Sequence, residues 1–274
     1  MAKGAKPAKL PVIQLLIERS LAPDERTAEA LIRRGLVKVD GGVCTSPGKL
    51  VASDDIVTVT PLPRFVSRGG DKLDGFLAES DLDVAGAVVA DIGASTGGFT
   101  DCLLKHGAER VYAVDVARGF LNGSLVGNPR VVQLDGVNAR YLTASHIPEP
   151  LDGAVIDVSF ISLALVIPAV APLVKAGGWI VPLIKPQFER EKGDRRAFAK
   201  GIVRDASVHR DVLTRILTAA QAEWGLAVKS VSRSTVKGTR GNVEFLALLV
   251  KGGRRMAVNR LAAMIERAVG RETA

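Results

Sequence analysis

Short apolar segments that alternate with helical ones between residues 85 and 250 limit the possible folds of this chain more than any other feature. Strand character is found at 88–93, 111–116, 131–134, 154–160 and 179–186, and helical periodicity at 97–106, 162–175 and 205–224. Apolar strands joined through helices form a mostly parallel sheet with helices on both faces. The segments 226–234 and 242–250 have no helix between them, which predicts a closing antiparallel hairpin before a last helix at 256–271. We therefore expect an α/β fold with a mostly parallel, seven-stranded sheet.

The first 60 residues have a different pattern and predict a separate small domain. Residues 1–8 suggest a flexible N-terminal tail and 10–19 a helix, and a second helix begins at Asp24 and ends at Arg34, before a glycine that can cap it. The segments 36–39 and 56–59 predict short strands, and Pro61 and Pro63 mark a linker. We predict a small α+β domain over 1–60, a linker and helix over 61–84, and the α/β domain over 85–274.

Composition excludes several classes of protein. The 274 residues are 47% hydrophobic and 24% charged, and no apolar segment approaches the roughly 18 residues needed to span a bilayer. The basic first residues lead into no apolar signal segment. Two cysteines are too few for a disulfide framework, and the three histidines lack the spacing of metal ligands. We expect a cytoplasmic protein that needs no metal and does not interact with membranes.

Charge is distributed unevenly along the chain. The formal net charge is +8, yet residues 80–186 hold 7 basic and 10 acidic side chains, whereas residues 224–274 hold 10 basic and 3 acidic ones. Basic segments outside an acidic centre favour a polyanionic partner such as nucleic acid. A solvated surface without a partner explains the same pattern, so this alternative stays open.

The segment 91–98, Asp-Ile-Gly-Ala-Ser-Thr-Gly-Gly, follows the first predicted strand and opens the first helix. An open parallel sheet binds ligands at this position, and the glycines allow the backbone to turn tightly and approach a ligand. The spacing matches neither a dinucleotide-binding loop nor a phosphate-binding loop. A carboxylate at Asp91 would repel a pyrophosphate but suits a cationic amino-acid group, and Asp115 after the second strand can accept both ribose hydroxyls. These features fit S-adenosylmethionine, with a merely tight strand–helix turn as the alternative.

Polar residues at the ends of later strands are expected at the same edge of the sheet. Asp157 ends the fourth predicted strand and Lys185 the fifth. Glu244 lies in an apolar strand, where a carboxylate needs a partner, and Lys72 follows the linker. For Lys185 the alternative is a side chain that extends from a strand end into solvent, and for Lys72 an ordinary exposed helix lysine.

Eight motifs in a fixed order carry a resemblance to a known family: SRGGDKL, DIGASTGGFTDCLL, VYAVDV, VNARYL, VIDVSFISL, LIKPQFE, GIVRD-x-x-VHR and GNVEF. Over nearly its whole length the chain resembles the TlyA/hemolysin A family. Its members look like FtsJ-type ribosomal RNA ribose 2′-O-methyltransferases with an N-terminal RNA-binding domain of the ribosomal-protein-S4 type. The resemblance implies a Rossmann-like methyltransferase fold and S-adenosylmethionine-dependent 2′-O-methylation of ribose in ribosomal RNA, with cytidine as the expected nucleotide. Ribosomal RNA or ribosomal subunits are the expected partners, and the protein would be a monomer or a dimer.

By motif, the resemblance also implies site residues. A catalytic Lys-Asp-Lys-Glu set falls on Lys72, Asp157, Lys185 and Glu244. Cofactor binding falls on Asp91, Gly93, Ala94, Ser95, Thr96, Gly97, Gly98, Asp115 and Asn138, the last of these near the adenine. Beside these, we expect basic side chains to contact RNA at Arg33, Arg34, Lys38, Arg68, Lys192, Arg195 and Arg196.

The chain departs from the family's pattern in three places. The usual Arg-Leu-Asp near the N-terminus is Lys-Leu-Pro at 9–11, which bears on RNA binding by the first domain. The usual Gly-Tyr-Gly after Asp115 is Ala-Arg-Gly at 117–119, and the loop before Gly201 is unusually basic, which bears on the choice of substrate. None of the four proposed catalytic positions is altered.

The chemistry of ribose methylation fits these residues. A ribose hydroxyl is a weak nucleophile at neutral pH, so its oxygen must be aligned with the methyl group and lose its proton. Lys185 is our candidate base, Lys72 would position the hydroxyl or a neighbouring phosphate, and Asp157 and Glu244 would orient the lysines. The alternative is an RNA-binding or ribosome-assembly factor that keeps a methyltransferase fold without catalysis. A membrane-lytic hemolysin is less consistent with a sequence that has neither a signal segment nor a membrane span.

Overall fold

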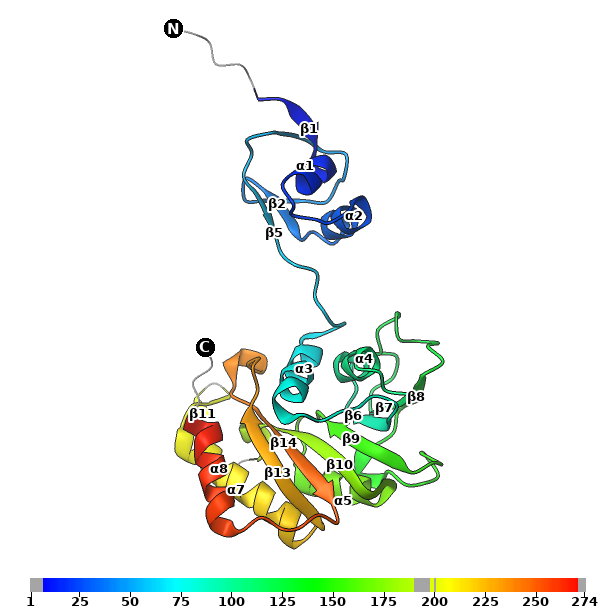
Figure 1. The fold of residues 1–274 in the computed structure, drawn as a ribbon, viewed down its shortest axis with the longest axis vertical. Helices are drawn as coiled ribbons and strands as arrows, with labels where there is room; N and C mark the ends of the chain where they lie inside the picture. Colours follow the sequence, from blue (N-terminus) through cyan, green and yellow to red (C-terminus); the bar gives the residue numbers. More distant parts are fainter. Residues whose placement is uncertain (1–6, 190–197, 200, 271–274) are drawn as a thin grey trace. The chain divides into compact units, whose positions relative to one another are not determined.

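A computed structural model describes residues 7–189, 198–199 and 201–270 of the chain. The tail expected at 1–8 therefore lies mostly outside the described residues, as do Lys192, Arg195 and Arg196. The chain divides into two compact units, Met1–Pro63 and Arg64–Ala274 (Figure 1). We describe each unit by itself.

The N-terminal unit contains two short helices and small antiparallel sheets. Helix α1 spans Val12–Glu18 and α2 spans Glu25–Arg33. Strand β1 (Lys9–Pro11) pairs with β4 (Leu50–Ala52), and β2 (Val37–Val39) lies between β3 (Gly42–Cys44) and β5 (Val57–Val59). The Asp24 side chain caps α2 by accepting a hydrogen bond from the Thr27 amide at 2.7 Å. Leu16, Ile32 and Val37 form the centre of a separate apolar core, so this unit has its own packing.

The larger unit is built on one seven-stranded sheet with the order β13-β14-β10-β9-β6-β7-β8. The strands span Val88–Ile92 (β6), Arg110–Asp115 (β7), Val131–Asp135 (β8), Leu151–Ile156 (β9), Val174–Ile184 (β10), Leu226–Arg233 (β13) and Phe245–Lys251 (β14). Strands β8, β7, β6, β9 and β10 run parallel, whereas β14 is antiparallel to both β10 and β13. The predicted α/β fold with a closing antiparallel hairpin is confirmed.

Helices cover both faces of this sheet. They are α3 (Arg68–Ser80), α4 (Gly98–Lys105), α5 (Leu163–Val170), the single turn α6 (Pro186–Glu189), α7 (Ala206–Ala222) and α8 (Val258–Gly270). Leu73 of α3 and Leu103 of α4 belong to one apolar layer, whereas Ile167 of α5, Leu213 of α7 and Leu261 of α8 belong to the other. Short elements complete the unit: 3₁₀ turns at Ala139–Tyr141, Ala171–Leu173 and Thr239–Gly241, and strands β11 (Phe198–Ala199) and β12 (Ile202–Val203).

Several boundaries differ from the predicted ones. The strand expected at 154–160 is Leu151–Ile156, because its partner β6 ends at Ile92 where Gly93 turns with φ +86°. The strand expected at 179–186 spans Val174–Ile184, and its pairing with β9 shifts in register between Val174 and Trp179. The glycine pair at 177–178 interrupts the apolar pattern, so the sequence did not indicate the earlier start. No helix in the described part of the chain is long and apolar enough to cross a membrane.

Candidate active site

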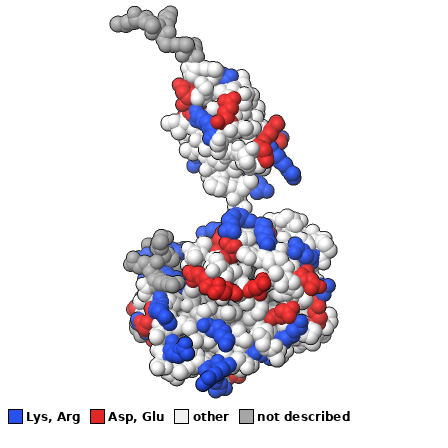
Figure 2. All heavy atoms as spheres, viewed as in Figure 1, with Lys and Arg blue, Asp and Glu red and all other residues white. Residues whose placement is uncertain are grey.

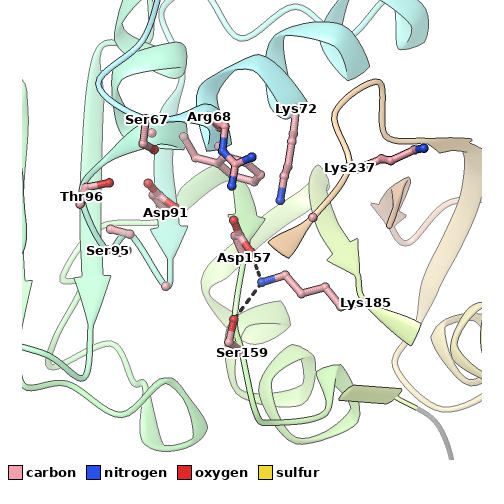
Figure 3. A pocket seen from close by; sticks show the side chains of 16 residues that line it. Ser67, Arg68, Lys72, Asp91, Ser95, Thr96, Asp157, Ser159, Lys185 and Lys237 are labelled. Carbon is pink, nitrogen blue, oxygen red and sulfur yellow. Dashed lines mark hydrogen bonds and ion pairs between the residues drawn. The ribbon is translucent and has the colours of Figure 1, made fainter. Parts of the chain in front are cut away.

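Two adjoining cavities lie where the parallel strands β6, β7, β9 and β10 end, at the carboxyl edge of the sheet. Figure 3 shows side chains that line the first of them. The first has a volume of about 370 Å³ and the second about 390 Å³. Both are lined by Gly93, Ser95, Asp157 and Ser159. An open α/β sheet binds its ligand in this crevice, so one elongated molecule can occupy both cavities.

Glycines are required by the geometry of the loop at 91–98. Gly93 and Gly97 have φ values of +86° and +89°, a region that other residues rarely adopt. A side chain at Gly93 would also lie 2.5 Å from the main-chain oxygen of Asp157. At Gly98 the corresponding atom would lie 2.2 Å from the hydroxyl of Ser67, just before α3. The loop therefore packs directly against the chain segments that carry the other residues of the site.

Asp91 is a fully buried carboxyl group at the end of β6. One oxygen, Oδ2, accepts a hydrogen bond from the Thr100 hydroxyl at 2.6 Å, whereas Oδ1 is buried with no hydrogen-bond partner among the described residues. Burial raises the pKa of Asp91 to about 7; the Thr100 hydrogen bond opposes this shift, and the charge of Asp157 adds to it. A cationic donor beside Oδ1 would satisfy both the charge and the missing hydrogen bond.

Asp115 and Asn138 line the second cavity. The Asp115 oxygens accept hydrogen bonds from the amides of Ser95 at 2.7 Å and Ala117 at 2.8 Å, which fixes the carboxylate at the end of β7. The Asn138 side chain accepts from the Arg140 amide at 3.1 Å and caps a 3₁₀ turn. The rest of the lining is largely apolar: Val114, Val116, Val137, Ala139, Val158, Ile161 and Val166. A fixed acceptor beside an apolar wall suits a ribose attached to a flat base.

The four residues expected to act in catalysis come together from distant parts of the sequence. Lys185 Nζ lies 2.5 Å from Asp157 Oδ1 and donates to Ser159 Oγ at 3.0 Å. Lys72 Nζ of α3 lies 2.6 Å from Glu244 Oε2. Lys72, Asp157 and Lys185 line the first cavity, and Figure 3 shows both lysines extending toward it. Glu244 does not line the cavity but lies behind Lys72, with 3% of its side chain exposed.

Comparison with known proteins agrees with this geometry. Residues 65–251 match the model of the FtsJ-like methyltransferase family, and residues 17–57 match that of the S4 domain. The chain belongs to the FtsJ-like methyltransferase family. Membership implies the use of S-adenosylmethionine.

Relatives extend the similarity over nearly the whole chain. The chain is 40% identical over 257 residues to the 16S/23S rRNA (cytidine-2′-O)-methyltransferase TlyA of Mycobacterium tuberculosis, covering 93% of this chain and 95% of the relative. It is 42% identical over 234 residues to YqxC of Bacillus subtilis, described as a candidate rRNA methyltransferase, covering 85% and 82% of the two chains. A solved structure of a protein described as a candidate hemolysin from Streptococcus thermophilus covers 96% of each chain at 37% identity, with a TM-score of 0.70.

Other residues of this methyltransferase site were not singled out from the sequence. Gln187 Nε2 donates to Glu244 Oε1 at 3.1 Å, so the two oxygens of Glu244 are shared between Gln187 and Lys72. Phe160 follows Ser159 with φ +64°, its ring is 4.8 Å from that of Phe188, and 90% of the residue is exposed. The motifs VIDVSFISL and LIKPQFE contain these residues, but only the fold shows what they contact.

The basic residues expected to contact RNA lie in different places. Arg68 lines the first cavity together with Lys237, which was not predicted. Arg34 and Lys38 are exposed on the N-terminal unit, where Arg33 forms an ion pair with Glu29 at 2.6 Å. On the face shown in Figure 2, basic side chains of the larger unit are scattered among acidic ones. The distribution of charge on this face therefore does not locate an RNA surface.

A possible set of metal ligands lies away from both cavities. Side-chain atoms of Asp74, Cys102 and His106 lie within 4.8 Å of one another, although no spacing in the sequence indicated this. Both oxygens of Asp74 already accept hydrogen bonds from Arg64, and Oδ1 also contacts His106 at 2.9 Å. Burial raises the pKa of the Cys102 thiol, which disfavours the thiolate that a metal would need. We assign no metal to this cluster.

Proposed function

We propose that this chain transfers a methyl group from S-adenosylmethionine to the 2′-hydroxyl of a ribose in ribosomal RNA, with cytidine as the nucleotide. The observation that carries the proposal is the junction of the two cavities, where Lys185 and Asp157 lie beside both the 91–98 loop and the opening lined by Arg68. The named activity of the TlyA relative supports the choice of ribosomal RNA and cytidine.

The two cavities fit the two ends of the cofactor. The buried, unsatisfied Oδ1 of Asp91 suits its ammonium group, and Asp115 suits the ribose hydroxyls beside the apolar wall near Asn138. Gly93, Ala94, Ser95, Thr96, Gly97 and Gly98 supply the turn that brings the backbone close to the ligand. When bound, S-adenosylmethionine supplies a methyl group on a positively charged sulfur, which is the electrophile of the reaction.

Each lysine has a separate task in this proposal. Lys185 accepts the proton of the 2′-hydroxyl once its own amine is neutral, and Asp157 and Ser159 hold its nitrogen in place. Lys72, held by Glu244, positions the ribose oxygen or the adjacent phosphate through its charge. The Lys72 side chain is little exposed, so solvent screens its electrostatic interactions less than it would at the surface.

RNA would reach the site from the opening of the first cavity. Arg68 and Lys237 can bind phosphates there. The exposed Phe160 offers a flat apolar surface next to Phe188, whose ring lies under Lys185 Nζ. The S4 domain at 17–57 supplies a second RNA contact through Arg34 and Lys38. Lys192, Arg195 and Arg196 were also expected to contact RNA, and they lie outside the described residues.

Methyl transfer from tritiated S-adenosylmethionine to purified 16S and 23S ribosomal RNA and to ribosomal subunits tests the proposal. We expect label on ribose 2′-oxygen, mapped by resistance of the modified position to alkaline hydrolysis, and a rate of labelling that is lower by roughly 10²–10⁴ with Lys185→Met. Tight binding of ribosomal RNA with no methyl transfer to any of these substrates would refute it and favour a non-catalytic assembly factor.

A further inference from the structure

The segment after β10 carries a buried carboxylate that none of the roles above uses. Glu189 is the last residue of the single-turn helix α6 and is only 4% exposed. Its Oε1 accepts a hydrogen bond from the Leu163 amide at 2.6 Å, and its Oε2 accepts one from the Ser162 hydroxyl at 2.7 Å. Leu163 is the first residue of α5, so the carboxylate lies at the positive end of that helix.

This contact joins the two chain segments that hold the proposed base and its partner. Strands β9 and β10 are hydrogen-bonded neighbours up to the pair Ile156 and Pro182. Beyond the sheet, one segment runs through Asp157 to Ser162 and the other through Lys185 to Glu189. The sheet joins these segments at one end and Glu189 joins them at the other, and the contacts of Lys185 with Asp157 and Ser159 lie between.

Glu189 is itself held firmly in this position. The amides of Phe188 and Glu189 donate to the Lys185 carbonyl at 2.9 and 3.1 Å, which fixes the turn that begins at the base. Arg215 of α7 donates to the Glu189 main-chain oxygen and lies 4.0 Å from its carboxylate. A displacement of the carboxylate would therefore move the turn that starts at Lys185.

The backbone of Phe160 indicates that joining the two segments at both ends constrains the chain between Asp157 and Ser162. Its φ of +64° is strained for a residue with a large side chain, and such conformations persist where the surroundings enforce them. The residue lies between Asp157 and Ser162, and its ring contacts that of Phe188 on the opposite segment.

We propose that Glu189 is a positioning residue for methyl transfer, which locks the segment after β9 to the segment after β10 and so holds Lys185 against Asp157 and Ser159. This inference rests on the proposed function for its kinetic consequence. Misplacing a catalytic group by about 1 Å can cost roughly a hundredfold in rate.

Single-turnover methylation at saturating cofactor and RNA tests this role. We expect Glu189→Ala to lower the rate about 10- to 100-fold, while the dissociation constants for cofactor and RNA change less than about threefold. Glu189→Gln keeps an acceptor for the Leu163 amide and a group that can bond Ser162, so it should stay within about fivefold of wild type. The exposed Glu223, at the end of α7, provides the matched control Glu223→Ala, which should match wild type.

A double variant separates positioning from general weakening of the fold. In a Lys185→Met background the residual rate no longer depends on Lys185, so adding Glu189→Ala should change it less than about twofold. A further loss as large as in the wild-type background would overturn the inference. So would a Glu189→Ala variant that, with Lys185 present, methylates within about threefold of wild type.

Hydrogen exchange supplies a measurement that needs no substrate. Glu189→Ala should speed deuterium uptake of peptides covering 157–163, because the Leu163 amide loses its acceptor, and Glu223→Ala should not. Unchanged uptake there would also refute the lock. If wild type methylates no ribosomal RNA, the proposed function fails, and hydrogen exchange still decides whether Glu189 joins the two segments.

Discussion

Binding of S-adenosylmethionine should depend on the ionisation of Asp91. Its pKa of about 7 reflects burial, and its free Oδ1 can pair with an ammonium group only when the carboxyl is ionised. The ionised fraction rises from about 3% at pH 5.5 to about 50% at pH 7. If only this form binds well, the dissociation constant should fall about sixteenfold over that range. The α-amino group of the ligand stays largely protonated over the same range, since its pKa is roughly 8.

Titration calorimetry measures this coupling directly. At pH 6 about 90% of the folded protein carries the proton, so binding should release about 0.9 proton, seen as a heat that varies with the ionisation enthalpy of the buffer. Asp91→Asn should bind more weakly, by about 1.5–3 kcal/mol, and should release no proton. Asp115→Asn is the matched control, because it should weaken binding yet keep the pH dependence. Equal affinities of wild type at pH 5.5 and 7, or proton release by Asp91→Asn, would refute the pairing.

The raised pKa of Asp91 also predicts the direction in which folding stability changes with pH. The pKa of Asp91 is raised from the ordinary 3.8 to about 7, so the unfolded chain loses this proton at lower pH than the folded one. Its contribution to the free energy of unfolding should fall as pH rises from about 4 to about 7 and stay constant above. The free energies of unfolding of wild type and Asp91→Asn, measured by denaturant titration, should therefore be similar at low pH and differ more as the pH approaches neutrality.

Other substitutions test the remaining roles. Lys185→Met and Lys185→Arg should both lower the single-turnover rate by roughly 10²–10⁴, because arginine keeps the charge but cannot deprotonate; an arginine variant within about tenfold of wild type would instead indicate positioning alone. Asp115→Ala should weaken cofactor binding about 10- to 100-fold in calorimetry without changing RNA affinity, and equal affinities would contradict the ribose contact. Replacing Arg33, Arg34 and Lys38 together should reduce the salt slope of RNA binding by about two, since Arg33 already pairs with Glu29; an unchanged slope would move the RNA surface elsewhere.

The sequence predicted the fold well because parallel strands covered by helices leave a strong apolar pattern. Val88–Ile92 and Leu151–Ile156 are buried along their whole lengths or nearly so, and polar residues such as Asp157 follow at the point where the ligand site must lie. All five strands described in the N-terminal unit have three residues, and the sequence predicted only Val37–Val39 and Val57–Val59, where two valines flank a polar residue. It missed three strands without this alternation: Lys9–Pro11, Gly42–Cys44 and Leu50–Ala52.

The residues of the site that were not predicted from the sequence are positioned by contacts between distant segments. Gln187 and Glu189 lie in one turn with Lys185, yet Gln187 contacts a residue 57 positions away and Glu189 contacts one 26 positions away. Neither spacing follows from strand or helix periodicity. Burial of Glu189 was equally hidden, since a glutamate after a short turn is usually exposed and only the start of α5 explains its position.

The ion pair between Lys72 and Glu244 joins residues 172 positions apart, and it has a consequence for how the enzyme is made. Strand β14 begins one residue after Glu244 and lies between β13 and β10. The seven-stranded sheet therefore cannot be completed until this late strand has emerged from the ribosome. The N-terminal unit, with its own core, can fold while synthesis continues. The proposed catalytic set can therefore form only near the end of translation, and nascent or truncated chains that stop before residue 244 hold the 91–98 loop and both lysines but lack Glu244, the partner of Lys72.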